Sequence, residues 1–214
     1  MADVSGPLQD TFALDAGWLC LDFTNTVVGR PISERVELIN GYDDLLSWAR
    51  QATILTPGEA AVLAEAGRRH PRAATDALNQ VLALREALYG LFSARAAGLP
   101  PEDSDLHTIN TSIGRAMSRA GLSPAPQGGF EWSWPGAAVG VERVAWWVAR
   151  SAAELMTSKE LAHVRECAGF DCGRLFMDRT KNRSRRWCDM ARCGNRAKGR
   201  RHYERRRSAR GGTG

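Results

Sequence analysis

Apolar residues recur at intervals of three and four positions along much of the first 160 residues, which is the period of a helix with one buried face. The clearest stripe contains Val81, Leu84, Leu88, Leu91 and Phe92. Gly98 and Pro100 follow it, and these residue types disfavour a continuing helix. The pattern therefore predicts a helix that packs this stripe against a core and ends near residue 98.

Other helices are predicted on both sides of this one. The segment Thr56-Pro57-Gly58-Glu59 is typical of a helix start, so a helix should run over residues 56–70. A helix with one apolar side is predicted over residues 105–120, where Gly121 would end it. The last predicted helix of the body, over residues 141–156, contains two adjacent tryptophans, and helical spacing assigns them to the core.

Residues 124–135 follow a different period. Large aromatic residues alternate there with polar ones, in the order Phe130, Glu131, Trp132, Ser133 and Trp134. Such alternation is typical of a strand with one buried face, and its partners are expected in Thr11 to Leu14 and Val36 to Ile39. We therefore expect an α+β fold with a mainly helical body and a small antiparallel sheet.

The composition is that of a globular protein with an unequal division of charge. Hydrophobic residues make up 43% of the chain and charged residues 25%, so most of the chain can bury a core. From Val164 onward 16 Lys and Arg stand against 5 Asp and Glu, a net charge of +11, whereas residues 1–163 have a net charge of −6. A basic end on a mildly acidic body indicates a polyanionic partner, and a solubilising basic tail is the alternative.

The sequence also indicates a compartment. No apolar run approaches the roughly 20 residues of a membrane helix, and the opening MADVSGPLQD lacks the layout of a signal peptide. We therefore expect a cytoplasmic protein with no membrane partner. Because the cytoplasm is reducing, clustered cysteines are better interpreted there as metal ligands than as disulfides.

Four of the five cysteines lie in one short segment. Cys167, Cys172, Cys188 and Cys193 form two Cys-x4-Cys pairs separated by 15 residues. Two close pairs on either side of a hairpin-length loop can surround one zinc ion, which prefers four thiolates in a tetrahedron. Because all four positions would be filled by protein ligands, we expect one structural Zn²⁺ and no catalytic metal.

Other interpretations of these thiols are two disulfides, a redox pair or unrelated cysteines. Cys20 lies apart from them in the apolar run WLCLDF and is expected to be buried away from the metal. His163 is close enough in sequence to replace one ligand, but a complete set of four cysteines makes it unnecessary. The predicted module is a small four-cysteine zinc finger made of a hairpin and a basic helix.

Basic residues surround the second cysteine pair. Arg174 to Asp178 is expected to form a short strand, the loop Arg179 to Arg186 should be exposed, and a helix should begin near Met190. A helix anchored by a metal has the width to enter the DNA major groove, and arginine favours forked hydrogen bonds to phosphate or guanine. Trp187 should pack over the zinc core, and stacking on nucleic acid is its alternative role. The candidate DNA contacts are Arg183, Arg185, Arg186, Asn195, Arg196, Lys198, Arg200 and Arg201.

These motifs resemble a known family. CGNRAK at Cys193 to Lys198, with RLFMD and RRWC before it and RRHYERR after it, is similar to the CGNR zinc fingers. LDFTNT at Leu21 to Thr26 and the late helix before the finger resemble the ABATE-type domain with which such a finger is usually paired. The resemblance implies a bacterial, stress-responsive transcription regulator. We divide the chain into a regulatory or sensing domain over 1–160, a zinc finger over 161–207 and a disordered tail over 208–214.

The resemblance does not supply an effector. The first domain should sense a small molecule of unknown identity or mediate assembly, with a homodimer as one outcome. Asp22, Asn25 and Thr26 could line a polar pocket in which Arg30 holds an anionic group. The alternative is that these side chains satisfy backbone groups at a turn or helix end.

The leading hypothesis is a zinc-dependent DNA-binding transcription regulator. The alternative is an RNA-associated or protein-recruiting adaptor in which the finger is a docking module. We do not expect an enzyme, because the four histidines are scattered and neither a phosphate-cradling glycine motif nor a nucleophile with its base stands out by spacing.

Overall fold

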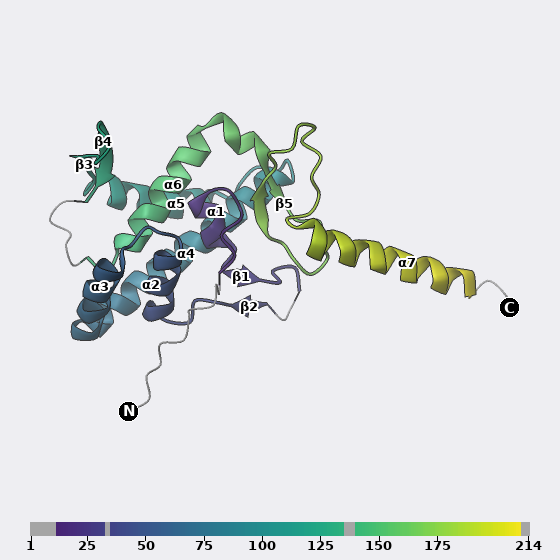
Figure 1. The fold of residues 1–214 in the computed structure, drawn as a ribbon, viewed down its shortest axis with the longest axis horizontal. Helices are drawn as coiled ribbons and strands as arrows, with labels where there is room; N and C mark the ends of the chain where they lie inside the picture. The colour runs from purple at the N-terminus through teal and green to yellow at the C-terminus, as the bar shows by residue number, and fades with distance from the viewer. Residues whose placement is uncertain (1–11, 33–34, 135–139, 211–214) are drawn as a thin grey trace, which may run out of the picture.

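A computed structural model describes residues 12–32, 35–134 and 140–210, with side chains in the last helix described as far as Arg205. Most of the chain forms a helical body, from which one long helix, α7 (Asn195–Arg210), projects into solvent (Figure 1). Short antiparallel strand pairs complete the fold. The fold is α+β, as the sequence predicts. Because α7 continues to Arg210, it extends beyond the boundary at residue 207, and residues 211–214 lie outside the described part.

The body is built from helices of very different length. Within the described residues, none of the helices is long and apolar enough to cross a membrane. The body helices are α1 (Leu19–Thr24), α2 (Tyr42–Gln51), α3 (Pro57–Arg69), α4 (Pro71–Ala96), α5 (Asp103–Met117) and α6 (Arg143–Thr157).

Helix α3 begins at the predicted capping motif. The Thr56 hydroxyl accepts a hydrogen bond from the Glu59 backbone N–H at 3.2 Å, and the Glu59 carboxylate accepts one from the Thr56 N–H at 2.8 Å. Two of the free N–H groups at the helix start are thereby satisfied. The cap and Pro57 together explain why α3 starts here.

Helix α4 forms the centre of the body. All five residues of the predicted stripe are buried, and α5, α6 and α1 pack against this helix. The helix begins at Pro71, ten residues before the stripe, because Ala74 and Ala77 continue the same buried face with small side chains. Between α1 and α2, the rings of Phe23 and Trp48 lie 4.7 Å apart and close the other side of the core.

The strands differ from the prediction of one small sheet. They form three separate antiparallel pairs. Strand β4 (Phe130–Ser133) pairs with β3 (Gly121–Pro124), not with the predicted partners. Val36 and Glu37 form β2, which pairs with β1 (Val27–Val28). Thr11 lies outside the described residues, and the following Phe12 to Leu14 form no strand.

Local pairing explains this difference. Gly128 and Gly129 have φ angles of 90° and 82°, and a turn at these glycines returns the chain to its nearest neighbour, β3. Pairing with a neighbouring segment costs less chain entropy than pairing with one far away. The β3–β4 hairpin stands at the edge of the body, so Phe130, which the alternation predicts to be buried, is 75% exposed.

A third hairpin connects the body to the cysteine segment. Strand β5 (Val164–Glu166) pairs with β6 (Leu175–Met177), and Cys167 and Cys172 lie between the two strands. Val164, Leu175 and Met177 pack in the main core, whereas Phe176 packs with the four cysteines. The two faces of this hairpin therefore belong to different cores, and the finger is built directly onto the body.

Buried hydrogen bonds reinforce this junction. The Asn25 amide, at the end of α1, donates to the Leu175 carbonyl at 2.8 Å and accepts from the Leu175 N–H at 3.0 Å. The Met177 N–H donates to the Ala16 carbonyl at 2.9 Å. On the other strand, the Glu166 carboxylate accepts a hydrogen bond from the Tyr89 hydroxyl of α4 at 3.0 Å. Both strands of the hairpin are thus bonded to the body.

We predict that Asn25→Ala lowers the free energy of unfolding by about 2 to 4 kcal/mol, because it leaves the buried N–H and carbonyl of Leu175 without partners. Urea denaturation of the zinc-loaded protein measures this change. Asn110→Ala, at an exposed position on α5, is the matched control and should change the stability little. Equal effects of the two substitutions would contradict the proposed junction.

Candidate metal centre and nucleic-acid interface

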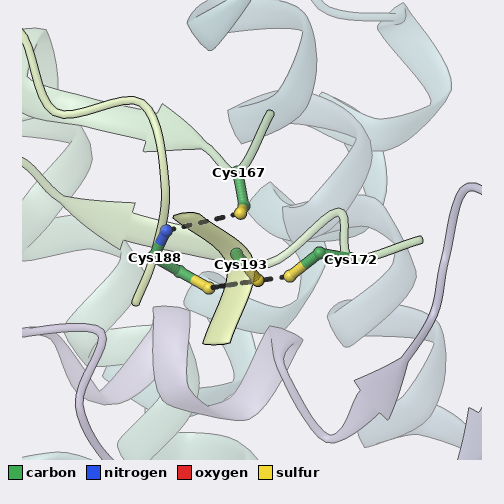
Figure 2. A group of neighbouring side chains, drawn as sticks. All are labelled: Cys167, Cys172, Cys188 and Cys193. Atoms are coloured by element: carbon green, nitrogen blue, oxygen red, sulfur yellow. Dashed lines mark hydrogen bonds between the residues drawn. The ribbon is translucent and has the colours of Figure 1, made fainter. Parts of the chain in front are cut away.

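Four cysteines converge from separate segments of the finger. Cys167 follows β5, Cys172 precedes β6, Cys188 follows the basic loop, and Cys193 lies in a π-helical turn, Met190–Gly194, that leads into α7. Figure 2 shows their sulfur atoms turning toward one another. All four side chains are buried. The two cysteine pairs therefore meet in space as their spacing in the sequence predicts.

The spacing of the sulfur atoms fits a zinc ion. The Cys172 and Cys188 sulfurs lie 3.6 Å apart, the Cys188 and Cys193 sulfurs 3.7 Å apart, and all four lie within 4.8 Å of one another. A zinc–sulfur distance of about 2.3 Å in a tetrahedron gives sulfur–sulfur edges of about 3.8 Å. A disulfide would need about 2.0 Å between sulfurs, so the arrangement is a metal site. The cysteines form a site for one zinc ion.

Local contacts favour a thiolate at one of these sulfurs. Hydrogen bonds from the Cys172 and Cys188 side chains hold the pKa of Cys167 well below that of an ordinary thiol. The Cys188 backbone N–H also donates to the Cys167 sulfur at 3.3 Å. A Cβ on Gly169 would lie 3.1 Å from the Cys172 Cβ, so a glycine suits this turn between the first two ligands.

The zinc site holds the beginning of α7. Asp189 caps the π-helical turn, because its carboxylate accepts hydrogen bonds from the backbone N–H groups of Ala191 at 2.6 Å and Arg192 at 3.0 Å. These bonds, that of Arg192 first, hold the pKa of Asp189 below its usual range. Cys193 lies inside the capped turn, so a bound metal fixes the position and direction in which α7 leaves the body.

Helix α7 has no apolar face of its own. Its side chains from Lys198 to Arg205 are all exposed, and the helix projects away from the rest of the molecule (Figure 1). Tyr203 is 68% exposed. Among the described side chains, Lys and Arg occur on more than one side of the helix, whereas Asn195, Gly199 and His202 share a side with no Lys or Arg.

Comparison with known families agrees with this geometry. A family model, ABATE, described as "Putative stress-induced transcription regulator", matches residues 17–159, which is more than half of the chain. The chain belongs to the ABATE family. A second model, the CGNR zinc finger, matches residues 163–206. No curated protein matches the chain. Below, the ABATE region denotes residues 17–159 and the CGNR finger residues 163–206.

The basic loop of the CGNR finger is organised by one buried carboxylate. Asp178 accepts hydrogen bonds from the Thr180 N–H at 2.9 Å and from the Arg185 N–H at 2.9 Å. Burial would raise the pKa of Asp178, but these bonds, those of Thr180 first, keep it below its usual value. Arg183 donates to the Asp178 carbonyl, and Arg185 donates to the carbonyls of Trp187 and Cys188.

The predicted DNA contacts therefore fall into two groups. Arg183 and Arg185 form the internal contacts of the loop, and Arg196 is paired with Asp171 at 2.7 Å while also approaching the Cys193 sulfur. All eight predicted contacts are exposed, so these internal bonds, not burial, distinguish the first group. The second group is Arg186, Asn195, Lys198, Arg200 and Arg201, of which Arg200 pairs with Glu204 of its own helix at 2.9 Å.

Two features of the finger surface complete this description. Arg192, absent from the predicted contacts, has a side chain that is 71% exposed. The sequence could have indicated Arg192 as a candidate, because this residue lies immediately before Cys193. The turn that contains Cys193 presents it at the start of the helix. Trp187 is half-buried and packs against the cysteine cluster, as predicted, with Arg186 5.4 Å from its ring centre.

Cys20 is separate from the metal site, as expected. It is buried in α1, and its backbone N–H donates to the Ser151 hydroxyl of α6 at 3.1 Å. Burial raises the pKa of the Cys20 thiol to about 12, so this thiol stays protonated at neutral pH. It is therefore a core residue of the ABATE region.

The LDFTNT side chains make internal contacts. Thr26 donates to the Phe23 carbonyl at 2.8 Å and accepts from Arg85 at 2.9 Å. Asp22 accepts from the Ala16 N–H at 2.9 Å. Asn25 holds β6, as described above, and also lines a cavity of about 380 Å³ between the β1–β2 pair and the finger.

Arg30, the predicted anion-binding residue, is likewise occupied. It pairs with Glu86 at 2.7 Å, donates to the Thr24 carbonyl at 3.1 Å and lies 3.9 Å from the centre of the Tyr89 ring. These contacts favour the structural interpretation of Asp22, Asn25, Thr26 and Arg30 that the sequence left open, in which they satisfy backbone groups at a turn or helix end.

We predict one zinc per chain in the purified protein and its loss in Cys193→Ser, because three thiolates hold zinc far less tightly than a closed tetrahedron. Elemental analysis and a colorimetric zinc-release assay measure both quantities. Cys20→Ala removes the remaining cysteine and should keep the full zinc content. Zinc retained by Cys193→Ser at wild-type affinity would contradict the assigned ligand set.

A second prediction concerns pH. Burial raises the pKa of Asp22 from 3.8 to about 6, so the folded chain holds a proton that the unfolded chain has released between these values. The contribution of this carboxyl to stability should therefore fall as the pH rises from about 4 to 6. Asp22→Asn should be more stable than the wild type at pH 7, and this advantage should shrink toward pH 4.

Urea denaturation in excess zinc at several pH values measures the difference between the two proteins. Because both contain the same finger, effects of pH on metal binding cancel in that difference. Asp76→Asn, at an exposed position of α4, serves as control. A difference between Asp22→Asn and wild type that is constant over this pH range would show that the Asp22 pKa is not raised.

Proposed function

We propose that this ABATE protein is a zinc-dependent DNA-binding transcription regulator in which α7 is the element that grips the duplex. The observation that carries the proposal is the geometry of this helix. It begins at the metal site, its side chains from Lys198 to Arg205 are exposed, and basic residues lie on more than one of its sides. So much positive charge on a helix repels itself, and phosphates would relieve this repulsion.

The shape of α7 suits the major groove. Sixteen residues extend over roughly 24 Å, and a groove about 12 Å wide admits one helix. A helix within the groove has a phosphate backbone on each side. Charges distributed around the helix, such as Lys198 and Arg201 on one side and Arg200 on another, match that environment better than a single basic stripe would.

Residues at the base of the helix could hold the flanking backbone. Lys181 and Arg186 line a cavity of about 410 Å³ beside Trp187 and Met190, in the loop that precedes the second cysteine pair. Arg192 is exposed at the start of α7. Together they support a footprint that continues from the helix onto the loop, where phosphate contacts would set the orientation of the finger.

We further propose that the ABATE region regulates this contact by binding a small-molecule effector or by pairing two chains as a homodimer. The β5–β6 junction supports this role, because the region and the finger share buried hydrogen bonds, and one face of the hairpin packs in the core of the body. A change in the packing of the body would therefore alter the position of α7. Two copies could read two half-sites of DNA.

We do not assign a catalytic function to the chain. The support is the metal site, in which four buried thiolates fill a tetrahedron and leave no coordination position for a water molecule or a substrate. The proposed role of the zinc is to hold the cysteine segments together and to fix the direction of α7.

An RNA-associated adaptor is the second candidate function. One observation favours it: Phe170 and Tyr203, on the finger surface, are 58% and 68% exposed, and exposed aromatic rings can stack on unpaired bases. Arg200 lies 4.6 Å from the centre of the Phe170 ring. Competition between a duplex DNA and a structured RNA of equal length separates the two functions, since the regulator should prefer the duplex.

We predict that a Lys198→Gln, Arg201→Gln double variant binds duplex DNA more weakly and with a shallower dependence on salt. Each lost phosphate contact should reduce the log-log slope by about 0.9. Fluorescence anisotropy of a labelled duplex at several salt concentrations measures affinity and slope. Arg68→Gln, on the exposed face of α3 and remote from the finger, should leave both unchanged.

The same assay tests the role of the metal. Cys193→Ser should lose binding, whereas Cys20→Ala should retain it. Enrichment and sequencing of retained duplexes from a random pool would then identify a target. Undiminished specific binding by Cys193→Ser, or a salt slope unaffected by removing Lys198 and Arg201, would reject α7 as the metal-anchored DNA contact.

A further inference from the structure

A cavity lies on the side of the ABATE region where the β3–β4 hairpin meets α6. It has a volume of about 760 Å³, within the range of small-molecule sites. Three parts of the fold supply its walls: the hairpin, α6, and the start of α3 together with Ile54 in the segment between α2 and α3. Its principal lining residues are Phe130, Trp132, Trp134, Arg143, Trp147 and Arg150.

Aromatic rings dominate this cavity. Trp134 and Trp147 meet edge to face, with ring centres 4.9 Å apart at an angle of 60°. Trp134 is buried and donates from its indole nitrogen to the Ala116 carbonyl at 3.0 Å, which fixes this ring. Trp132 is half-buried and Phe130 is largely exposed at the rim. Trp134 belongs to the main core and Trp132 and Trp147 pack against it, so these rings are held by the fold while they also form the wall of an open space.

Arg150 places positive charge among these rings. Its guanidinium lies 5.8 Å from the centre of the Trp132 ring and 5.4 Å from that of Trp147. Among the described residues, its hydrogen bonding consists of the Nε contact to Glu154 at 2.9 Å. The two Nη groups of Arg150 are thus available to a further acceptor, and an arginine presents them as a fork suited to a carboxylate.

The other charges in the cavity are compatible with an anion. Arg143 is paired with Glu59 at 2.6 Å, and Glu59 also accepts the capping hydrogen bonds of α3, so this glutamate is already engaged. Glu131 is exposed at the hairpin. A cationic ligand would have to displace Arg150 from the tryptophan faces, whereas an anion would complement it.

We propose that this cavity binds a planar aromatic anion, with its ring against Trp132 and Trp147 and its carboxylate on the Nη groups of Arg150. The proposal names the class of ligand for the effector-binding role proposed above. Only the expected effect of the ligand on DNA binding rests on that role. Binding itself requires neither zinc nor DNA, so it can succeed or fail independently of the proposed regulator function.

Helix α6 gives such a ligand a direct connection to the finger. It carries Trp147 and Arg150, and its Ser151 accepts the hydrogen bond from Cys20 in α1, the helix that ends at Asn25. After Thr157 the chain continues through one short helical segment into β5. A shift of α6 on ligand binding would therefore reach both strands that hold the metal site.

The test uses naphthoate as the probe, the zinc-loaded full chain and no DNA. Isothermal titration calorimetry gives the affinity, and the indole N–H signals of the seven tryptophans in a ¹H–¹⁵N NMR spectrum locate the site. The signals of Trp132, Trp134 and Trp147 should shift, while those of Trp48 and Trp187 should not. Naphthylmethanol, which lacks the charge, and cyclohexanecarboxylate, which lacks the planar ring, should both bind more weakly.

Substitution of the charged group provides the decisive comparison. Arg150→Gln should weaken naphthoate binding by about tenfold or more, as expected for a lost charge-assisted hydrogen bond, and should change naphthylmethanol binding little. Arg68→Gln is the matched control and should change neither. Trp132→Leu, on the hairpin, should weaken both aromatic probes.

Three results would overturn the proposal: no measurable naphthoate binding, shifts confined to tryptophans outside the cavity, or an Arg150→Gln affinity within twofold of the wild type. Thermal melting of each variant separates lost binding from lost folding. If naphthoate binds as described but leaves the DNA affinity unchanged, the site stands and the regulatory link proposed for the ABATE region fails.

Discussion

The β5–β6 hairpin has two faces that belong to different cores, and the arrangement of the molecule depends on this shared element. Val164, Leu175 and Met177 pack in the core of the body, and Phe176 packs with the cysteines. A small metal module usually has too little apolar surface to be stable by itself. Here the cysteines around the metal site form one core, and the body provides the other. The hairpin itself joins the finger to the body, so this connection does not depend on a separate linker.

This arrangement gives the basic helix a defined direction. The π-helical turn that leads into α7 contains Cys193 and is capped by Asp189, while the hairpin that carries the first two ligands is bonded to Asn25 after α1. A rigid base matters for a helix that projects from the molecule and whose side chains from Lys198 to Arg205 are all exposed (Figure 1). Positions of charges at the far end of such a helix are reproducible only if its base is fixed.

The basic residues of this protein have two kinds of surroundings. Arg30 is held by Glu86 and Thr24 within the ABATE region, and Arg183 and Arg185 are held by backbone carbonyls within the loop. On the surface of α7, Lys198 and Arg201 have no such carboxylate contact among the described groups. Hydrogen bonding therefore separates basic residues that the loop uses internally from those without a carboxylate partner, and composition alone cannot, since both kinds occur in the same basic segment.

The sequence by itself determined the elements whose causes are local. Helical periodicity located the α4 stripe, the Thr56 cap located α3, and cysteine spacing identified all four metal ligands, because each depends on neighbours within a few turns of chain. Tertiary structure alone decided which strands pair, that Asn25 holds strand β6 of the finger, and that Trp132 and Trp147 line a cavity with Arg150. These depend on contacts between segments far apart in the chain, and no local period encodes them.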